Sequence, residues 1–400
     1  MLHDPARHEP LLDIPWDASR ARDAIARIAR ETVQALPPGG WWPLHPNDVE
    51  AGDDPALPNP TLYFGAAGVA WALRHLGVDV PDFSGRWDEL VALDRRWLAS
   101  IASPNPGSWL MGELPVAMMA WGDAPSPALA DRIEALIAAN LDDPARELMW
   151  GSPGSLLAAA FMQGRSGDER WAALFRRIAG RLREQLAWSE RHRCFLWTQD
   201  LYGRTSRYLD AVHGFVATAR ALLKGRHLLA AADWAEWQTR IEQTVANTAL
   251  REDGRASWPA EAEEPPERVQ KWLMQFCHGA PGFVICLADL PGTALDALLA
   301  EAGEATWAAG PLAKGSNLCH GTAGNGYAFL ALHARTGDAR WLARARAFAM
   351  HAIAQFERDT AASGRLRHSL WTGDPGLAIY LQDCVRGVGR FPTLDVFFAD

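Results

Sequence analysis

Two short stretches of the chain each place a cysteine directly before a histidine and a glycine. One CHG motif begins at Cys277 and the other begins at Cys319. Zinc favours a mixture of thiolate and imidazole ligands, and a catalytic zinc typically has three protein ligands and one open position. Soft sulfur ligands also disfavour magnesium and calcium. The sequence therefore predicts a zinc site that uses both cysteines and a neighbouring histidine.

The pattern alone leaves the histidine ligand open, because His278 and His320 stand at equivalent places in the two motifs. The remaining cysteines lack such a neighbour and are expected to pack as small buried hydrophobes. They are Cys194, Cys286 and Cys384. An odd number of cysteines at irregular spacing in a long chain argues against a disulfide framework, so we expect reduced thiols.

Both motifs belong to a longer internal repeat in which a glycine-containing turn leads into a nearly all-apolar helix. The leading glycines are Gly65, Gly112, Gly151, Gly214, Gly279, Gly321 and Gly373. Amphipathic segments alternate with these repeats, at 128–140, 169–188, 234–250 and 340–359. A helix that is apolar on every side must be covered on every side, whereas an amphipathic helix keeps one wet face.

This alternation predicts an all-α fold, an α/α toroid of about seven inner and seven outer helices. We expect one domain over residues 1–400, with residues 1–25 as an N-terminal extension that packs on the barrel. The inner-helix N-termini should converge at one end of the axis, where their dipoles favour anions. A toroid of the glycosidase type would leave the two Cys-His pairs without a purpose.

Composition excludes several partners. The formal charge of −9 disfavours nucleic acid and anionic lipid surfaces. No apolar run approaches the roughly 18 residues that suggest a transmembrane helix, so membrane insertion is not expected. The first 25 residues lack the basic start and apolar stretch of a secretory signal, which predicts a cytoplasmic protein.

The strings CHGAPG from Cys277 and KGSNLCHGTAGNGYAFL from Lys314, together with the seven glycine turns, resemble the lanthionine synthetase C-like (LanC-like) proteins. The resemblance covers nearly the whole chain and is closest to the stand-alone, eukaryotic-type branch. It implies the α/α toroid with Zn²⁺ on Cys277, Cys319 and His320, and so selects His320 over His278. Leu273 stands where the lantibiotic cyclases carry an arginine, which weakens the cyclase interpretation.

The family chemistry is addition of a thiol to dehydroalanine or dehydrobutyrine in a peptide, with glutathione as the donor in the stand-alone branch. Such an enzyme activates the thiol on zinc and needs a general acid for the α-carbon. The resemblance implies that His213 donates or accepts this proton and that Glu147 orients His213 or relays the proton. It also implies that Lys314 and Arg365 bind glutathione, with Arg367 as a rival for Arg365.

We therefore predict a zinc-dependent transferase that joins glutathione, or another small thiol, to a dehydroamino-acid residue in a peptide or protein. Two alternatives remain open at this point. One is a lantibiotic-type cyclase that forms lanthionine rings in a precursor peptide. The other is a non-catalytic binding protein that retains a structural zinc, in which a fourth protein ligand would close the site.

Overall fold

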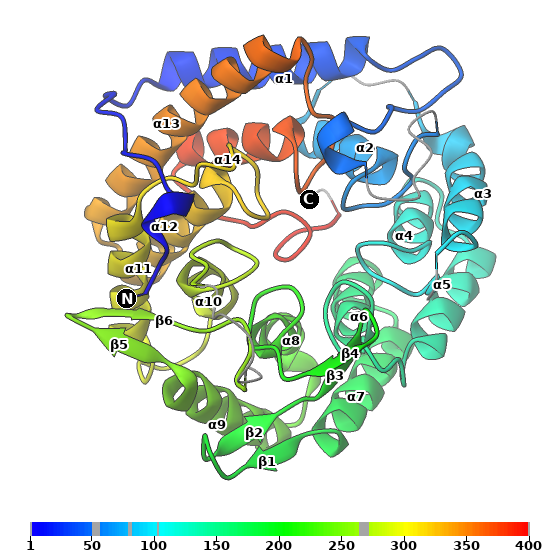
Figure 1. Ribbon diagram of the computed structural model, residues 1–400. Coiled ribbons are helices and arrows are strands. Elements are labelled where there is room, and N and C mark those ends of the chain that lie inside the picture. The colour runs from blue at the N-terminus through cyan, green and yellow to red at the C-terminus, as the bar shows by residue number, and fades with distance from the viewer. Residues whose placement is uncertain (1, 50–56, 79–81, 102–103, 264–271, 399–400) are drawn as a thin grey trace.

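Alternating helices build a closed double ring (Figure 1). The computed structural model describes residues 2–49, 57–78, 82–101, 104–263 and 272–398, and these contain fourteen α-helices. The outer helices are α1 (Ala18–Gln34), α3 (Trp87–Leu98), α5 (Pro127–Ala139), α7 (Glu169–Glu184), α9 (Ala231–Thr248), α11 (Asp296–Ala309) and α13 (Ala339–Ser363). The inner helices are α2 (Ala66–Leu76), α4 (Leu114–Asp123), α6 (Ser152–Ser166), α8 (Phe215–Lys224), α10 (Ala280–Leu287), α12 (Thr322–Thr336) and α14 (Asp374–Arg386). The predicted α/α toroid is confirmed.

Burial separates the two layers as the sequence pattern predicts. Every residue of α12 from Thr322 to Leu330 is buried. Helix α7, by contrast, buries one face through residues such as Trp171 and Phe175 and leaves Arg177 exposed. An apolar stripe about 100° wide is what an outer helix needs to face a core. No helix among the described residues is long and apolar enough to cross a membrane.

The ring is closed by its two chain ends. Helix α1 packs along α14 and also touches α13 (Figure 1). Arg20 Nη2 on α1 donates to Glu357 Oε2 on α13 at 2.9 Å, across 337 positions of sequence. Residues 18–25, which belong to the predicted N-terminal extension, therefore form part of an outer helix. The preceding segment lies against the barrel, where His351 Nε2 lies 2.7 Å from Glu9 Oε1.

A polar side chain caps the turn before most inner helices. It stands four positions before the leading glycine and accepts the backbone N–H of the residue three positions later. This cap occurs at Thr61, Ser108, Glu147, Asp210 and Asn317. Local side-chain acceptors of this kind stabilise turns. The capped N–H belongs to the residue just before the glycine, so the cap fixes the place of that residue in each turn.

Backbone hydrogen bonds join neighbouring turns into a belt around one end of the ring. Six of the links are Cys277 N to Cys319 O, Cys319 N to Trp371 O, Trp371 N to Tyr63 O, Tyr63 N to Leu110 O, Leu110 N to Met149 O, and Leu148 N to Val212 O. Side chains make the remaining link, because His278 Nδ1 lies 2.9 Å from Asp210 Oδ2. All seven turns are therefore held in one register.

At most of the leading positions glycine is required because a Cβ atom would collide with nearby backbone, and not because φ is positive. Gly321 has an ordinary extended φ of −126°, but a Cβ there would lie 2.4 Å from the Asn317 nitrogen. Gly279 differs, because its φ of +103° is one that other residues rarely adopt. Glycine at these positions lets the chain fold back tightly before the helix starts.

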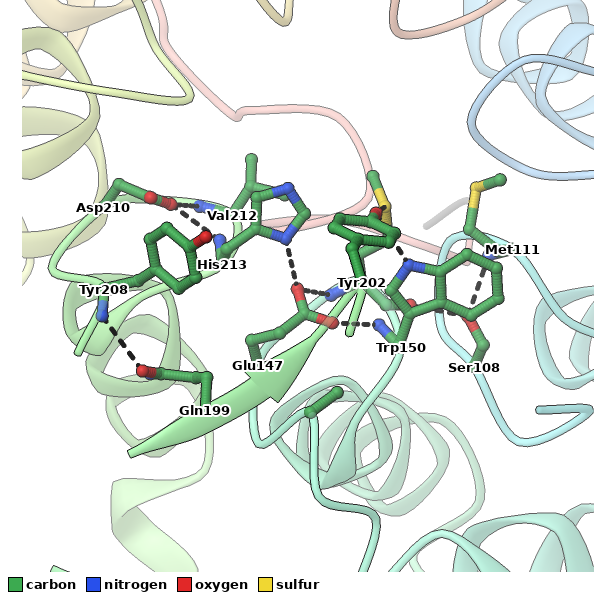
Figure 2. Close-up of polar contacts among 12 residues, drawn as sticks. Ser108, Met111, Glu147, Trp150, Gln199, Tyr202, Tyr208, Asp210, Val212 and His213 are labelled. Carbon is green, nitrogen blue, oxygen red and sulfur yellow. Dashed lines mark hydrogen bonds and ion pairs between the residues drawn. The ribbon is translucent and has the colours of Figure 1, made fainter. Parts of the chain in front are cut away.

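Three short two-stranded antiparallel hairpins lie among the helices, and the sequence pattern did not predict them. Their strands are β1 (Ala187–Ser189), β2 (Cys194–Leu196), β3 (Gln199–Leu201), β4 (Arg204–Ser206), β5 (Leu250–Glu252) and β6 (Arg255–Ser257). Each strand has three residues, which is too short for a period of two to stand out in the sequence. The β3–β4 hairpin lies at the belt end, beside the turn that contains Glu147 (Figure 2).

The C-terminal segment fills the middle of the ring. After α14 the chain enters the centre of the toroid (Figure 1). There Phe391 stacks on Phe276 with ring centroids 4.3 Å apart, and Phe397 packs against Trp109 at 5.0 Å. Asp395 forms an ion pair with the buried Arg220 of α8. The centre of the ring is therefore filled by packed side chains.

Candidate metal centre

The two cysteines and the histidine selected by the resemblance meet within the belt. Ligand atoms of Cys277, Cys319 and His320 all lie within 4.8 Å of one another. The first comes from the turn before α10 and the other two from the turn before α12, and a 3.1 Å backbone hydrogen bond joins these turns. Both cysteines are buried and the histidine is half-buried. The cluster found among the described residues thus offers the sulfur and nitrogen donors that zinc prefers.

Two neighbouring side chains donate hydrogen bonds to the sulfurs. The Tyr63 hydroxyl donates to Cys319 Sγ at 2.8 Å, and Gln275 Nε2 donates to Cys277 Sγ at 2.9 Å. The hydrogen bond between the two sulfurs raises the pKa of Cys277, as does burial. The same bond, with help from His320, lowers the pKa of Cys319. Two buried thiolates this close together repel each other, so a bound cation would favour the deprotonated form of both sulfurs.

The other histidine of the CHG motifs contacts a different partner. His278 Nδ1 lies 2.9 Å from Oδ2 of Asp210, a carboxylate that is 1% exposed. Burial alone would raise the pKa of Asp210, but His278 and then His213 hold that pKa below its usual value. The metal-type cluster contains His320 and not His278. The structure thus gives the two histidines separate environments.

His213 and Glu147 form a second histidine–carboxylate pair in the neighbouring turns (Figure 2). His213 Nδ1 lies 2.8 Å from Glu147 Oε2, and the carboxylate is fully buried. The Glu147 carboxylate also accepts two backbone hydrogen bonds, from the N–H groups of Met149 and Trp150 at 2.9 and 2.5 Å. A carboxylate held at three points keeps the imidazole in one orientation.

The charge around His213 favours its protonated form. Burial lowers the pKa of His213, but the hydrogen bond and charge of Glu147 outweigh it, and Asp210 and Cys319 add to the effect. The net result raises the pKa of His213 to about 9. His213 is therefore an imidazolium at neutral pH, with Nδ1 bound to Glu147 and Nε2 left for other partners. Such a group can act as a general acid.

The basic residues named by the resemblance line one cavity of about 110 Å³ at the belt end. Lys314, Arg365 and Arg367 all contribute to its wall. Lys314 and Arg365 are exposed. Arg367 instead donates from Nε to Asp48 Oδ2 at 2.7 Å and makes a second bond through Nη2 to the same carboxylate. The geometry therefore distinguishes Arg367, which is held by an internal acid, from the other two cations.

Sequence reasoning missed Tyr63 and Asp210, although both occupy repeat positions that carry a signal. Tyr63 stands two residues before its leading glycine, as do Cys277 and Cys319. Asp210 stands four residues before its glycine, as does Glu147. Aligning the seven turns on their glycines would have placed both in the belt. What each contacts depends on which turns are neighbours in space.

Comparison with known families identifies the class of protein. Residues 128–395 match the family model for lanthionine synthetase C-like protein. The chain therefore belongs to this family. Nisin cyclase has a similar solved structure, with a TM-score of 0.56 and 13% identity, over 91% of this chain and 93% of that one. This likeness supports the shared toroid fold.

Two curated relatives are similar over shorter stretches. The chain is 35% identical to "Glutathione S-transferase LANCL1" of Danio rerio over 131 residues, which is 31% of this chain and 32% of the relative. It is 31% identical to "LanC-like protein GCL1" of Arabidopsis thaliana over 156 residues, or 36% of this chain and 33% of the relative. The alignments span about a third of each relative. Both are eukaryotic, in agreement with the predicted branch.

Proposed function

We propose that the protein is a zinc-dependent enzyme that adds glutathione to dehydroalanine or dehydrobutyrine residues of peptides or proteins and so forms a thioether. The observation that carries this proposal is the placing of Cys277, Cys319 and His320 in the same belt of turns as the His213–Glu147 pair. A relative named as a glutathione S-transferase supports the choice of thiol.

The donor set fits zinc on chemical grounds. Two sulfurs and an imidazole nitrogen form the three-ligand set of a catalytic site, and the described residues supply no fourth ligand to this cluster. Zinc bound there would lower the pKa of a substrate thiol and so supply a thiolate nucleophile. Tyr63 and Gln275 would donate to the cysteine sulfurs, which stabilises their negative charge.

His213 supplies the proton that the addition requires. A thiolate attacks the alkene carbon, the carbon–carbon π bond breaks, and the negative charge moves to the α-carbon and the carbonyl oxygen. The thiol releases its proton to solvent when it becomes a thiolate. His213 donates its own proton to the α-carbon and is then reprotonated from solvent by one equivalent proton, so the net change is the addition of one thiol across the double bond. Glu147 keeps Nδ1 occupied and the ring positively charged, which leaves Nε2 to deliver the proton.

The cavity beside Lys314 and Arg365 suits the carboxylates of glutathione. The cavity of about 110 Å³ presents both cations on its wall, so it suits an acidic end of the tripeptide. The rest of the molecule must extend from this cavity toward the sulfurs. Lys314 belongs to the loop before α12, which also carries Cys319. Arg365 belongs to the neighbouring loop before α14.

The direct test is to incubate the zinc-loaded protein with glutathione and a dehydroalanine peptide. Mass spectrometry should show the peptide with one added glutathione, formed faster than without protein. An adduct rate equal to the uncatalysed rate would contradict the proposal. A sample treated with a chelator provides the control for zinc dependence.

Substitution of either cation should weaken glutathione binding selectively. We expect Lys314→Ala and Arg365→Ala each to raise the KM for glutathione about threefold to fivefold, since partly exposed charge pairs contribute on the order of 1 kcal/mol or less. The KM for the peptide should not change. Arg386→Ala, which removes an exposed arginine from the far end of α14, is the matched control. Equal KM values in all four proteins would remove these residues from the donor site.

The raised pKa of His213 predicts a pH dependence. The acid is present below its pKa, so kcat should be constant near neutrality and fall as pH rises through about 9. Glu147→Gln removes the carboxylate that opposes the effect of burial, so the falling limb should move at least one pH unit lower. Lys314→Ala should leave the limb in place. An unchanged limb in Glu147→Gln would show that another group is titrating.

A further inference from the structure

A strained and exposed tyrosine lies beside the His213–Glu147 pair. Tyr202 is at the tip of the β3–β4 hairpin and is 70% exposed. Its φ of +55° is followed by +72° at Gly203, so both central residues of the two-residue turn are left-handed. This turn type prefers asparagine or aspartate at its first position, and a tyrosine there is unfavourable.

The same chain shows that the turn does not require tyrosine. The β5–β6 hairpin has an equivalent two-residue turn, with φ of +52° at Asp253 and +71° at Gly254. That turn uses the favoured Asp-Gly pair. A bulky aromatic residue at Tyr202 therefore needs a reason outside the turn, and strained backbone with an exposed ring is typical of a binding position.

Tyr202 is directed over the site (Figure 2). Its hydroxyl accepts the Trp150 Nε1–H at 3.0 Å and lies 3.7 Å from Met149 Sδ. Its ring stands edge-on to His213, with centroids 5.9 Å apart and an interplanar angle of 83°. Trp150 in turn stacks on Trp97 of α3 at 6.4 Å and 12°. These aromatic rings form a continuous track that ends at the proposed acid.

The hairpin is anchored to the turn that contains Glu147. Asp200 N donates to Pro144 O at 2.9 Å, and Arg146 Nη1 donates to Thr198 O at 2.6 Å. Tyr202 and Glu147 are thus carried by one connected unit. Within the track, Trp150 and Tyr202 precede α6 and α8 and Trp97 is on α3, whereas Lys314 and Arg365 precede α12 and α14. The turn with Cys277, before α10, lies between the two regions on one side of the belt.

We propose that Trp97, Trp150 and Tyr202 form the acceptor platform, on which the peptide lies with its dehydroamino-acid residue at His213. The inference rests on the proposed function and names the side from which the acceptor enters. Aromatic faces suit a peptide with an apolar side chain next to the reacting residue. Tyr202 is then a specificity-determining residue of the acceptor site.

The test measures acceptor binding separately from chemistry. Fluorescein-labelled peptides with alanine in place of dehydroalanine, flanked by either leucine or serine, are titrated with the zinc-loaded protein and followed by anisotropy. Wild type should prefer the leucine peptide. Tyr202→Asn introduces a residue that the turn favours and removes the ring, so it should weaken binding of the leucine peptide about threefold to tenfold and reduce the preference.

Asp253→Asn is the matched control, because it changes the equivalent turn of the other hairpin. It should bind both peptides as wild type does. In turnover, Tyr202→Asn should raise the KM for a leucine-flanked dehydroalanine peptide and leave the KM for glutathione unchanged, with no loss of thermal stability. Wild-type affinity in Tyr202→Asn, with adduct still formed, would overturn the platform and spare the proposed function. Absence of adduct from wild type would instead overturn the function.

Discussion

Replacing Cys277 by alanine is expected to remove the metal and the activity together. Wild type should contain close to one zinc per chain by metal analysis, and Cys277→Ala much less after the same dialysis. Loss of one of three ligands leaves only Cys319 and His320, and zinc binding depends on the full donor set. Thiol addition by the variant should fall to the uncatalysed rate.

The control is Cys286→Ala, on the same stretch of chain. Burial raises the pKa of Cys286 well above its ordinary value, so this residue is a packing thiol inside α10. Its replacement should cost some stability through a small cavity and leave zinc content near one. Equal zinc in wild type and Cys277→Ala would show that the metal, if present, binds elsewhere.

Replacing His213 by glutamine should abolish most of the turnover and leave the zinc in place. General acids contribute about 10²- to 10⁴-fold to such reactions, so kcat should fall by that order. The KM for glutathione should change little, because the cations of the donor cavity are on other turns. Steady-state kinetics and metal analysis on one preparation give both quantities.

His333→Gln on the inner helix α12 is the matched substitution, because this histidine is in the last turn of its helix, away from the belt. It should retain wild-type kcat. A His213→Gln protein that keeps zinc and more than about a tenth of the wild-type kcat would contradict the assignment of His213 as the acid.

The fold could be predicted because local sequence features determine it. Seven glycine turns and the contrast between all-apolar and amphipathic helices are visible along the chain, and each has a direct meaning for burial. The hairpins escaped prediction for the opposite reason. Their strands are only three residues long, and the residue at the tip of one of them, Tyr202, is unlike a normal turn residue.

The candidate site was predictable only as far as repeat positions define it. Cys277, Cys319 and the histidines next to them attract attention by residue type. Tyr63 does not, because a tyrosine in an apolar stretch is ordinary, and its contact with Cys319 depends on the first and sixth turns being close in space. The different roles of Arg365 and Arg367 likewise could not be predicted, because Arg367 is paired with Asp48, which lies far away in sequence.

The closure of the ring by α1 and α14 has consequences for how the protein reaches its native state. A linear repeat array can nucleate anywhere and fray at its ends, but here the terminal units cover each other. Contacts such as Arg20 with Glu357 join residues 337 positions apart, and such high contact order slows folding. The bond from Trp371 N to Tyr63 O crosses this seam, and so does the bond from Tyr63 to Cys319. The hydrogen-bonded environment of the sulfurs is therefore complete only when the ring is closed.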